Sequence, residues 1–476
     1  MSNYDAVVVG SGPNGLAAAI TLARAGCSVV VFEACETPGG GTRTQELTLP
    51  GFWSDVCSAI HPLALASPFF RSLPLTEYGL EWAQPTYSLA HPLDDGSAAV
   101  LARSIEETGE SLGPDAAAYR RLMAPLAANW EKILEDMLGP LPFPPKHPLA
   151  DALFGLSAIR SGRGLARSVF RGQKARAMFT GMAAHSILPL DRMISASFGL
   201  VMGMLGHAVG WPAARGGSQQ IANALVSYLR ALGGEVVTSH PVESVDELPP
   251  ARAVLLDITP RQLLRLAGPR LTPGYRQQLE RFRYGPGVFK VDWALSGPVP
   301  WKAQAGHLAG TLHLGGTMDE VAASEAAVWS GQEAEKPFVL FTQQSLLDPT
   351  RAPQGQHTGW GYCHVPNGST ADMTGRIEAQ VERFAPGFRD CILGRSVKFT
   401  TGMEQYNANY IGGDINGGVQ DIRQLFTRPT LQPFNPYVTS DPSLFLCSSS
   451  TPPGGGVHGM CGYHAAKAAL KGPLKS

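Results

Sequence analysis

The sequence predicts an α/β fold in which a parallel sheet flanked by helices is interleaved with an α+β domain of antiparallel sheet and helices. Three observations support this prediction. A strand–turn–helix–strand unit opens the chain, further strands of the same type recur near residues 211–259 and 443–469, and strand-like runs fill residues 285–366. The length of 476 residues is enough for two to four domains.

The composition is that of a folded protein without an extreme charge. Hydrophobic residues make up 44% and charged residues 16%, so the chain can bury a large core. The 38 Lys and Arg balance the 39 Asp and Glu, which argues against a nucleic-acid-binding surface over the whole protein. The 54 glycines and 38 prolines predict many tight turns and close approaches of backbone to a ligand.

Cysteine usage and hydropathy predict a cytoplasmic protein. The seven cysteines are odd in number and form no CxxC pair, which argues against a disulfide framework and a zinc ribbon. No signal peptide opens the chain, and no window of about 18 residues is uncharged and apolar. We therefore expect a reducing compartment, with the protein at most resting on a membrane surface.

The N-terminal unit has the features of a dinucleotide-binding motif. Residues 5–9 predict a buried parallel strand, and a glycine turn over residues 10–15 leads into an Ala-rich helix that ends at Gly26. A second strand over residues 28–32 ends at Glu33, which is spaced to take the ribose hydroxyls. The turn places phosphates at the amides of the helix N-terminus. The chain therefore opens with a Rossmann-like domain.

The glycines of this turn have separate roles. Gly10 permits the tight turn, Gly12 lets the backbone approach a pyrophosphate, and Gly15 lets the helix pack closely on the strand. The other residues of the turn that we expect to contact the cofactor are Ser11, Pro13 and Asn14. No second glycine cluster has a flanking strand, helix and acid, so we expect no nicotinamide domain.

A second glycine-rich turn follows Glu33. It contains Gly39, Gly40, Thr42 and Thr44. At these spacings it resembles the turn after the ribose-binding Glu in flavoproteins of the amine-oxidase and carotenoid-desaturase group. Gly41 stands where that group has Arg, and Arg43 lies two residues later, where contact with the pyrophosphate or only with the turn surface is open. The resemblance implies FAD as the cofactor, with contacts at Ala34, Gly40, Gly41, Thr42 and Arg43.

The C-terminal segment combines a strand over residues 443–447, a Pro/Gly-rich turn over residues 452–456 and a helix expected to start near Val457. This order resembles the closing motif of bacterial-type phytoene desaturases, whose helix dipole stabilises the negative charge of a reduced flavin. His458 stands where that family commonly has Pro. Two roles are open for its side chain: contact with the flavin, or capping of the helix. The implied cofactor contacts are Gly455, Gly456, Val457 and His458.

Two further segments extend the resemblance over most of the chain. Residues 211–218 and the helix and strand after them resemble the family segment that returns to the FAD domain, with Val242 at the adenine-flanking position. Residues 407–418 resemble the branch that includes pyridine nucleotide-disulphide oxidoreductase domain-containing protein 2, although no redox CxxC is present here. The fold implied is an FAD domain interleaved with a substrate domain, as in amine oxidases and phytoene desaturases.

The resemblance places the domain boundaries. The discontinuous FAD-binding domain would combine residues 1–70, 206–270 and 420–476. The substrate domain, with a helical lid, would combine residues 71–205 and 271–419. Helices are predicted there over residues 105–111, 115–138 and 370–384, with a rigid Pro-rich turn over residues 139–148. Strands of an antiparallel sheet above the flavin are predicted over residues 287–295, 307–315, 337–345 and 357–366.

Five basic residues recur every three or four positions between residues 156 and 179, as on one face of a helix. They are Arg160, Arg163, Arg167, Arg171 and Lys174. We interpret them as the solvated face of a helical lid. The alternative is peripheral contact with an anionic membrane, where a lipophilic substrate would reside.

Candidates for the chemistry lie near segments expected to face the flavin. His61 is a candidate base, or else it caps the following turn. Lys290 corresponds by resemblance to a Lys that in related amine oxidases holds a water near flavin N5. His185 is interpreted as a core histidine, and Tyr410 and Asp414 as residues that order a Gly-rich turn.

The resemblance implies an FAD-dependent oxidoreductase that transfers hydride between a hydrophobic isoprenoid, carotenoid or lipid substrate and flavin N5. Oxygen or a quinone is the expected electron acceptor, no metal is expected, and a homo-oligomer is left open. One alternative is an amine or amino-acid oxidase, for which Trp293, Trp360 and Tyr362 would supply aromatic groups. The other alternative is an FAD-containing scaffold or membrane-associated interaction protein without turnover.

Overall fold

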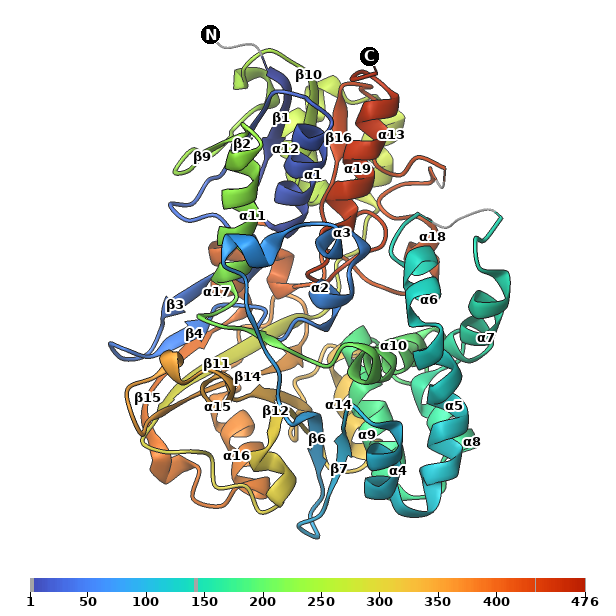
Figure 1. Cartoon of the computed structure of the whole chain (residues 1–476), viewed down its shortest axis with the longest axis vertical. Helices are drawn as coiled ribbons and strands as arrows, with labels where there is room; N and C mark the ends of the chain where they lie inside the picture. The colour runs from blue at the N-terminus through green and yellow to red at the C-terminus, as the bar shows by residue number, and fades with distance from the viewer. Residues whose placement is uncertain (1–3, 141–143, 433, 476) are drawn as a thin grey trace.

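The computed structural model describes residues 4–140, 144–432 and 434–475, which form two interleaved lobes (Figure 1). The upper lobe in Figure 1 holds both ends of the chain around a parallel sheet. The lower lobe holds a larger, mainly antiparallel sheet beside a group of helices. The predicted α/β fold, a Rossmann-like sheet interleaved with an α+β domain, is thereby confirmed.

The parallel sheet gathers segments that are far apart in the sequence. Its strand order is β16-β10-β1-β2-β9, and every neighbouring pair is parallel. The Val-rich and Leu-rich strands are buried because helices cover both faces. Their bounds are β1 Tyr4–Val9, β2 Val29–Phe32, β9 Glu235–Val237, β10 Ala251–Leu256 and β16 Leu444–Leu446.

Alternate residues of β1 separate the two cores of this lobe. Ala6 and Val8 face a core shared with α1 (Pro13–Arg24), α11 (Gln219–Ala231) and α19 (Met460–Lys471). Val7 and Val9 face a core shared with α12 (Pro260–Ala267) and α13 (Pro273–Glu280). This alternation follows from the two-residue period of a strand and makes the sheet the middle layer of the lobe.

The lower sheet has the strand order β15-β11-β14-β13-β12-β6-β7. The four predicted strand-like runs form β11, β14, β13 and β12, whereas β6, β7 and β15 were not predicted. β12 runs parallel to β6, and the other neighbouring strands are antiparallel. Their bounds are β6 Tyr87–Pro92, β7 Ala98–Leu101, β11 Gly287–Leu295, β12 Ala309–Leu314, β13 Val339–Thr342, β14 His357–Val365 and β15 Ile392–Lys398.

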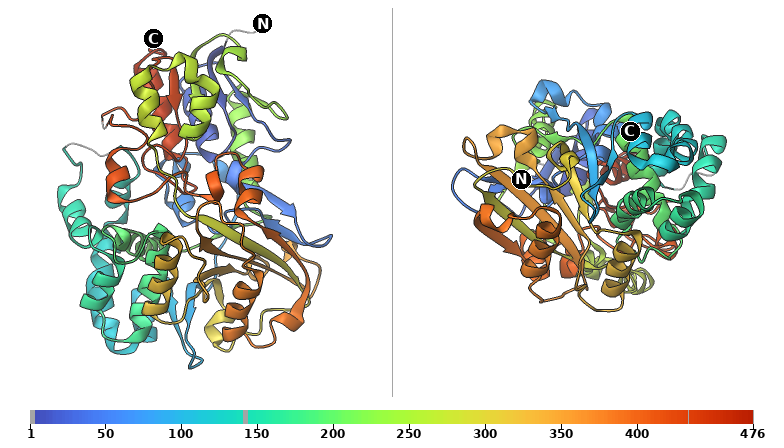
Figure 2. Two further views of the ribbon diagram at one scale, coloured as in Figure 1. Left: turned by 180° about the vertical axis from the view of Figure 1, so that it is seen from behind. Right: turned by 90° about the horizontal axis from the view of Figure 1, so that it is seen from below.

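The helical group lies beside this sheet, as both views of Figure 2 show. Its helices are α4 Ile105–Leu112, α5 Ala116–Ala128, α6 Trp130–Met137, α7 Pro148–Ala158, α8 Gly162–Val169, α9 Gln173–Ala183 and α10 Ser195–Ala208. The predicted helical patterns are therefore present, although the second one is divided between α5 and α6. The Pro-rich turn predicted over residues 139–148 lies partly outside the described residues.

The basic stretch does not form one helical face. It is divided among α7, α8 and α9, so the predicted spacing does not align its side chains. Arg163 bonds to Asp191 and Asp319, and Arg167 also bonds to Asp319. Through Asp319 these arginines join the helical group to α14 (Met318–Trp329) instead of forming a continuous charged stripe.

Further helices and strands lie between these elements. The helices are α2 Pro62–Ala66, α3 Pro68–Arg71, α14 Met318–Trp329, α15 Gln344–Leu347, α16 Thr374–Phe384, α17 Thr400–Tyr406 and α18 Ile422–Phe426. The strands are β3 Thr44–Glu46, β4 Trp53–Asp55, β5 Trp82–Ala83 and β8 Ala213–Ala214. Within the described residues no helix is long and apolar enough to cross a membrane.

The last helix begins later than predicted. We expected it near Val457, but α19 starts at Met460. Gly456 has a φ of +125° and Gly459 a φ of +68°, values that a right-handed helix does not contain. The glycine-rich turn therefore extends by several residues before the helix can start.

Candidate cofactor and substrate site

A cavity of about 570 Å³ is lined by residues of both lobes. One end lies at the carboxyl ends of β1, β2 and β10, the edge at which ligands of parallel α/β sheets bind. The other end reaches residues of β11, β12, β13 and β14. An elongated ligand can therefore touch the parallel sheet at one end and the lower sheet at the other.

At the parallel-sheet end, Glu33 is the centre of a buried network. Its carboxylate accepts hydrogen bonds from the backbone amides of Ser11 and Cys35, both at 2.9 Å, and from the Ser11 hydroxyl. Arg43 forms an ion pair with it at 3.0 Å and also donates to the Thr37 carbonyl. Arg43 is thus buried against the predicted ribose-binding acid and not spread over the turn surface.

The glycine turn has the close approaches that the motif requires. A Cβ at Gly15 would collide with the Gly10 carbonyl, and one at Gly12 would lie 2.8 Å from Asp257 Oδ2. Asn14 lines the cavity, and its Oδ1 is buried without a partner among the described residues. A bare backbone cradle beside an unpartnered polar atom fits the phosphate end of a dinucleotide.

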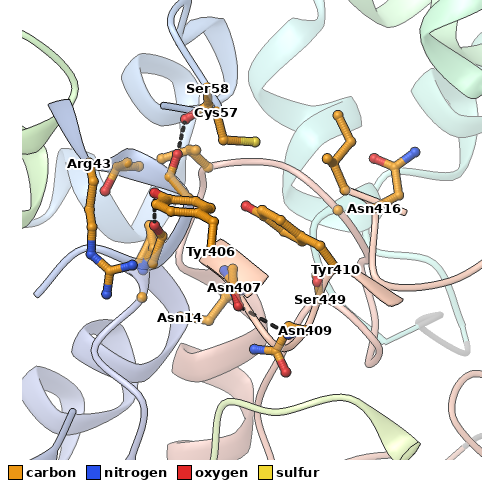
Figure 3. Close-up of a pocket in the computed structure, with 18 of the residues that line it drawn as sticks. Asn14, Arg43, Cys57, Ser58, Tyr406, Asn407, Asn409, Tyr410, Asn416 and Ser449 are labelled. Carbon is orange, nitrogen blue, oxygen red and sulfur yellow. Dashed lines mark hydrogen bonds between the residues drawn. The ribbon is translucent and has the colours of Figure 1, made fainter. Parts of the chain in front are cut away.

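A loop after α17 forms a further wall (Figure 3). The rings of Tyr406 and Tyr410 lie 6.4 Å apart between their centroids, and the Tyr406 hydroxyl donates to the Gly40 carbonyl at 2.5 Å. A Cβ at Gly41 would collide with the Tyr410 hydroxyl. The family's Arg therefore has no room at residue 41, which explains why glycine stands there.

Sequence reasoning missed most of this wall. Asn409 connects this wall to the segment after β10 of the parallel sheet. The Asn409 side chain donates a hydrogen bond to the Asp257 carbonyl at 2.9 Å and accepts one from the Thr259 amide at 3.0 Å. The Asn-rich and Gly-rich run over residues 407–418 was the available signal. The lining residues that were not predicted include Tyr406, Asn407, Asn409, Asn416, Gln420 and Ser449.

Most of the predicted cofactor contacts line the cavity, and their contact with the cofactor stays a prediction. They are Gly10, Ser11, Gly12, Pro13, Asn14, Glu33, Ala34, Gly40, Gly41, Thr42, Arg43, Val242, Gly455, Gly456 and Val457. Gly15 does not line the cavity; it packs closely against the Gly10 carbonyl on the other side of the turn. His458 is not among the lining residues: its ring is buried among backbone groups, accepting from the Met460 amide and contacting the Gly454 carbonyl, and its contact with the flavin also stays a prediction.

Residues 14–267 match the family of flavin containing amine oxidoreductases. The chain belongs to this family. It is therefore an FAD-dependent oxidoreductase. We expect the cofactor in the cavity that both lobes line, because one end of that cavity lies at the carboxyl ends of the parallel strands. FAD, when bound, supplies an acceptor for hydride.

Three known proteins are similar to this flavin oxidoreductase over nearly its whole length. Pyridine nucleotide-disulfide oxidoreductase domain-containing protein 2 of Rattus norvegicus is 26% identical over 97% of this chain and 92% of its own. Phytoene desaturase (neurosporene-forming) of Rhodobacter capsulatus is 26% identical over 96% of this chain and 92% of its own. The structure of cyclohexylamine oxidase from Brevibacterium oxydans IH-35A has a TM-score of 0.60 at 17% identity, covering 99% of each chain.

Lys290 lies in the cavity wall of this flavin oxidoreductase, on β11. Its ammonium forms a fully buried ion pair with Asp292 and lies 5.4 Å from the centroid of the Trp360 ring. Burial lowers the pKa of Lys290 and raises the pKa of Asp292, because each charge leaves water. The pair is the one fully buried Lys–carboxylate contact among the described residues, and Lys290 is its cavity-facing member.

His61 also lines the cavity, but its ring is tied to the structure. The Ser218 hydroxyl donates to the Ser58 carbonyl at 2.7 Å, so His61 Nε2 must donate to that hydroxyl at 2.8 Å. The remaining nitrogen, Nδ1, is buried without a partner among the described residues. Burial lowers the pKa of His61 to about 4, which keeps the ring neutral at pH 7. Its role as a base stays a prediction.

The other residues named from the sequence have distinct places. His185 is not purely a core residue, because it lines the cavity and contacts His313 behind it. Asp414 orders its turn by accepting from the amides of Gly285 and Gly418, at 2.7 and 2.8 Å. Trp293 faces away from the cavity, where its indole donates to Glu378 at 3.1 Å.

Proposed function

We propose that this flavin oxidoreductase removes hydride from an apolar substrate of the isoprenoid, carotenoid or lipid class. The observation that supports this proposal is the apolar lining of the cavity. The wall beyond the glycine turn is mostly aliphatic and aromatic. It includes Ile60, Leu63, Phe198, Met202, Trp211, Val288, Leu340, Trp360, Tyr362 and Met403. Such a surface gains free energy by removing apolar ligand surface from water.

The distribution of acids disfavours an amine substrate. Among the described residues that line the cavity, the carboxylates are Glu33, Glu243 and Asp257, and all three lie at the dinucleotide end. A protonated amine needs a carboxylate or an open aromatic face as its partner. Near the lower sheet the cavity offers an ammonium group instead, that of Lys290.

The aromatic residues Trp293, Trp360 and Tyr362 do not form a cage for a cation. Trp360 and Tyr362 meet edge to face, with an interplanar angle of 86° at 5.1 Å between ring centroids. The ammonium of Lys290 already lies over the Trp360 ring. Trp293 lies outside the cavity. A second cation beside Lys290 would be repelled, whereas an apolar chain would meet no such cost.

The residues of the cavity would act mainly by positioning. Lys290 would hold a proton or a polar group beside the reacting carbon, and its pairing with Asp292 fixes the ammonium in place. The His61 ring is neutral, so its unpartnered Nδ1 at the cavity wall would be able to accept a hydrogen bond or a proton. Bound FAD would supply the acceptor for a hydride from the substrate, the second hydrogen would leave as a proton, and oxygen or a quinone would take up the two electrons afterwards.

The name of a full-length relative agrees with this substrate class. The Rhodobacter capsulatus relative is a phytoene desaturase, and that resemblance extends over both lobes of this chain. Contact with a membrane surface, from which an apolar substrate would be drawn, belongs to the same proposal. The cytoplasmic location and a homo-oligomer also stay predictions.

Anaerobic reduction of the holoenzyme tests the proposal. Isoprenoid hydrocarbons in detergent micelles, primary amines and amino acids would each be mixed with the oxidised protein, and flavin absorption followed. The proposal expects bleaching by a member of the first group only. Bleaching by amines or amino acids would contradict it. If dithionite bleaches the flavin but no organic donor in the panel does, the scaffold alternative gains support over turnover.

A further inference from the structure

Asp257 lies at the carboxyl end of β10, against the glycine turn. Its Oδ2 accepts a hydrogen bond from the Gly15 amide at 3.0 Å. The same oxygen is 2.8 Å from the place that a Cβ at Gly12 would take, and the residue lines the cavity. The carboxyl group therefore lies at the backbone where the motif receives the pyrophosphate.

No cation compensates this carboxyl group among the described residues. Its one direct partner is the neutral amide of Gly15, and no Arg, Lys or His forms an ion pair with it. The charged or titratable groups that influence it from neighbouring elements are Glu33 after β2, Cys447 after β16 and Cys461 of α19. Arg265 of α12 and His240 line the same cavity without bonding to it. Ionisation would thus place an unpaired negative charge among neutral and acidic groups.

Bound phosphates would make that ionisation still less favourable. Phosphates held at the helix N-terminus would place two negative charges near Asp257, and charges of like sign repel strongly in a partly desolvated site. A protonated carboxyl has neither problem. It can donate its O–H to a phosphate oxygen while its other oxygen still accepts from Gly15.

We propose that Asp257 is a ligand of the FAD pyrophosphate in its protonated form, so that an ionised Asp257 takes up a proton from solvent when the cofactor binds. The carboxyl O–H would donate to a phosphate oxygen, and no covalent bond changes. The proposal concerns only the cofactor, so it stands or falls independently of the substrate class proposed above.

The expected pH dependence follows from the state of the free protein. Burial and the charge of Glu33 raise the pKa of Asp257 to about 7, so the group is about half protonated at pH 7 before FAD binds. Because only the protonated form would bind, the Kd should rise about tenfold between pH 6 and pH 8. Proton uptake per FAD should be about 0.1 at pH 6, about 0.5 at pH 7 and about 0.9 at pH 8.

Isothermal titration of the full-length apoprotein with FAD, in two buffers of different ionisation enthalpy at each pH, measures both quantities. Asp257→Asn keeps the shape, can accept from Gly15 and can donate to phosphate without a proton from solvent. It should bind FAD with a similar Kd at pH 6 and pH 8 and without the proton uptake. Glu110→Gln, which removes an exposed carboxylate of α4, should behave as the wild type.

Two results would overturn the proposal. One is a wild-type Kd that does not change with pH, together with no proton uptake. The other is an Asp257→Asn protein that keeps the wild-type pH dependence, which would assign the proton to another group such as His240. If the variant does not fold, the wild-type proton count in the two buffers still decides between uptake and none.

Discussion

The Nε2 atoms of His185, which lines the cavity, and His313, which lies behind it, are 3.0 Å apart. One ring donates and the other accepts, so the two rings share one proton in this contact. Burial lowers the pKa of His185 to about 3 and that of His313 well below its usual value. His91, close to His313, is likewise buried, with its pKa lowered to about 4. The core therefore holds a row of neutral histidines.

Acid should destabilise the fold because it protonates these buried histidines. Since the folded pKa values lie below the unfolded value of about 6.5, the stabilisation is complete above pH 6.5 and is lost as the pH falls toward 4. Each neutral histidine should cost about 2 kcal/mol of unfolding free energy at pH 5. Urea unfolding at pH 7.5 and pH 5 measures this loss. His185→Gln/His313→Gln should lose less stability over that interval, and a loss equal to the wild type would contradict the assignment.

Lys290 and Asp292 should separate stability from activity. Lys290→Met leaves the buried carboxylate unpaired and should lower the unfolding free energy by about 3–5 kcal/mol. Lys290→Met/Asp292→Asn removes both charges and should recover most of that loss. Flavin reduction by the substrate should stay at least about 100-fold slow in the double variant, because the cavity ammonium is gone. If the flavin of the double variant were reduced at the wild-type rate, the Lys290–Asp292 pair would have only a structural role.

Gly12 should tolerate no side chain in the holoenzyme. Its φ of −65° suits any residue, so Gly12→Ala changes only the space beside Asp257. Crowding at this point should weaken FAD binding by at least about tenfold. A fluorescence titration with FAD measures the change. Gly274→Ala in α13, where a Cβ meets nothing within 4 Å, is the matched control and should bind FAD normally.

Glu33 should contribute to FAD affinity as a carboxylate. Glu33→Gln would weaken the charged hydrogen bonds that we expect the carboxylate to accept from the ribose hydroxyls. Such bonds are worth about 1.5–3 kcal/mol, so FAD affinity should fall by about 10- to 100-fold. Glu36→Gln changes an exposed acid three residues later and should have no such effect. The FAD content of the two purified proteins gives the comparison. Equal content and equal Kd would show that Glu33 serves only to hold Ser11 and Arg43.

Local patterns allowed much of the fold to be predicted. The turn at Gly10 and the acid at Glu33 belong to one short unit, whose spacing alone determines where its strands and helix lie. The strand β11 was readable as a long, mostly apolar run, and β14 was readable from its alternating pattern. The strand β15 was missed because its central residues are mostly half-exposed or exposed and include charges.

Contacts between distant segments could not be predicted. Asp257 reaches the glycine turn across 242 residues of sequence, and His185 meets His313 across 128. Tyr410 was interpreted as ordering its own turn, yet its hydroxyl occupies the space beside Gly41. These relationships depend on how the lobes assemble, which no local spacing records.

The most direct test of the account is a single anaerobic turnover with an extract of cellular lipids, followed by mass spectrometry of the products. We predict that the flavin bleaches and that, in equal amount, an apolar molecule appears with two hydrogen atoms fewer than its precursor. Bleaching by polar amines with no change in any lipid would contradict the proposed substrate class. A protein that shows no flavin spectrum even after reconstitution with FAD would contradict the cofactor site itself.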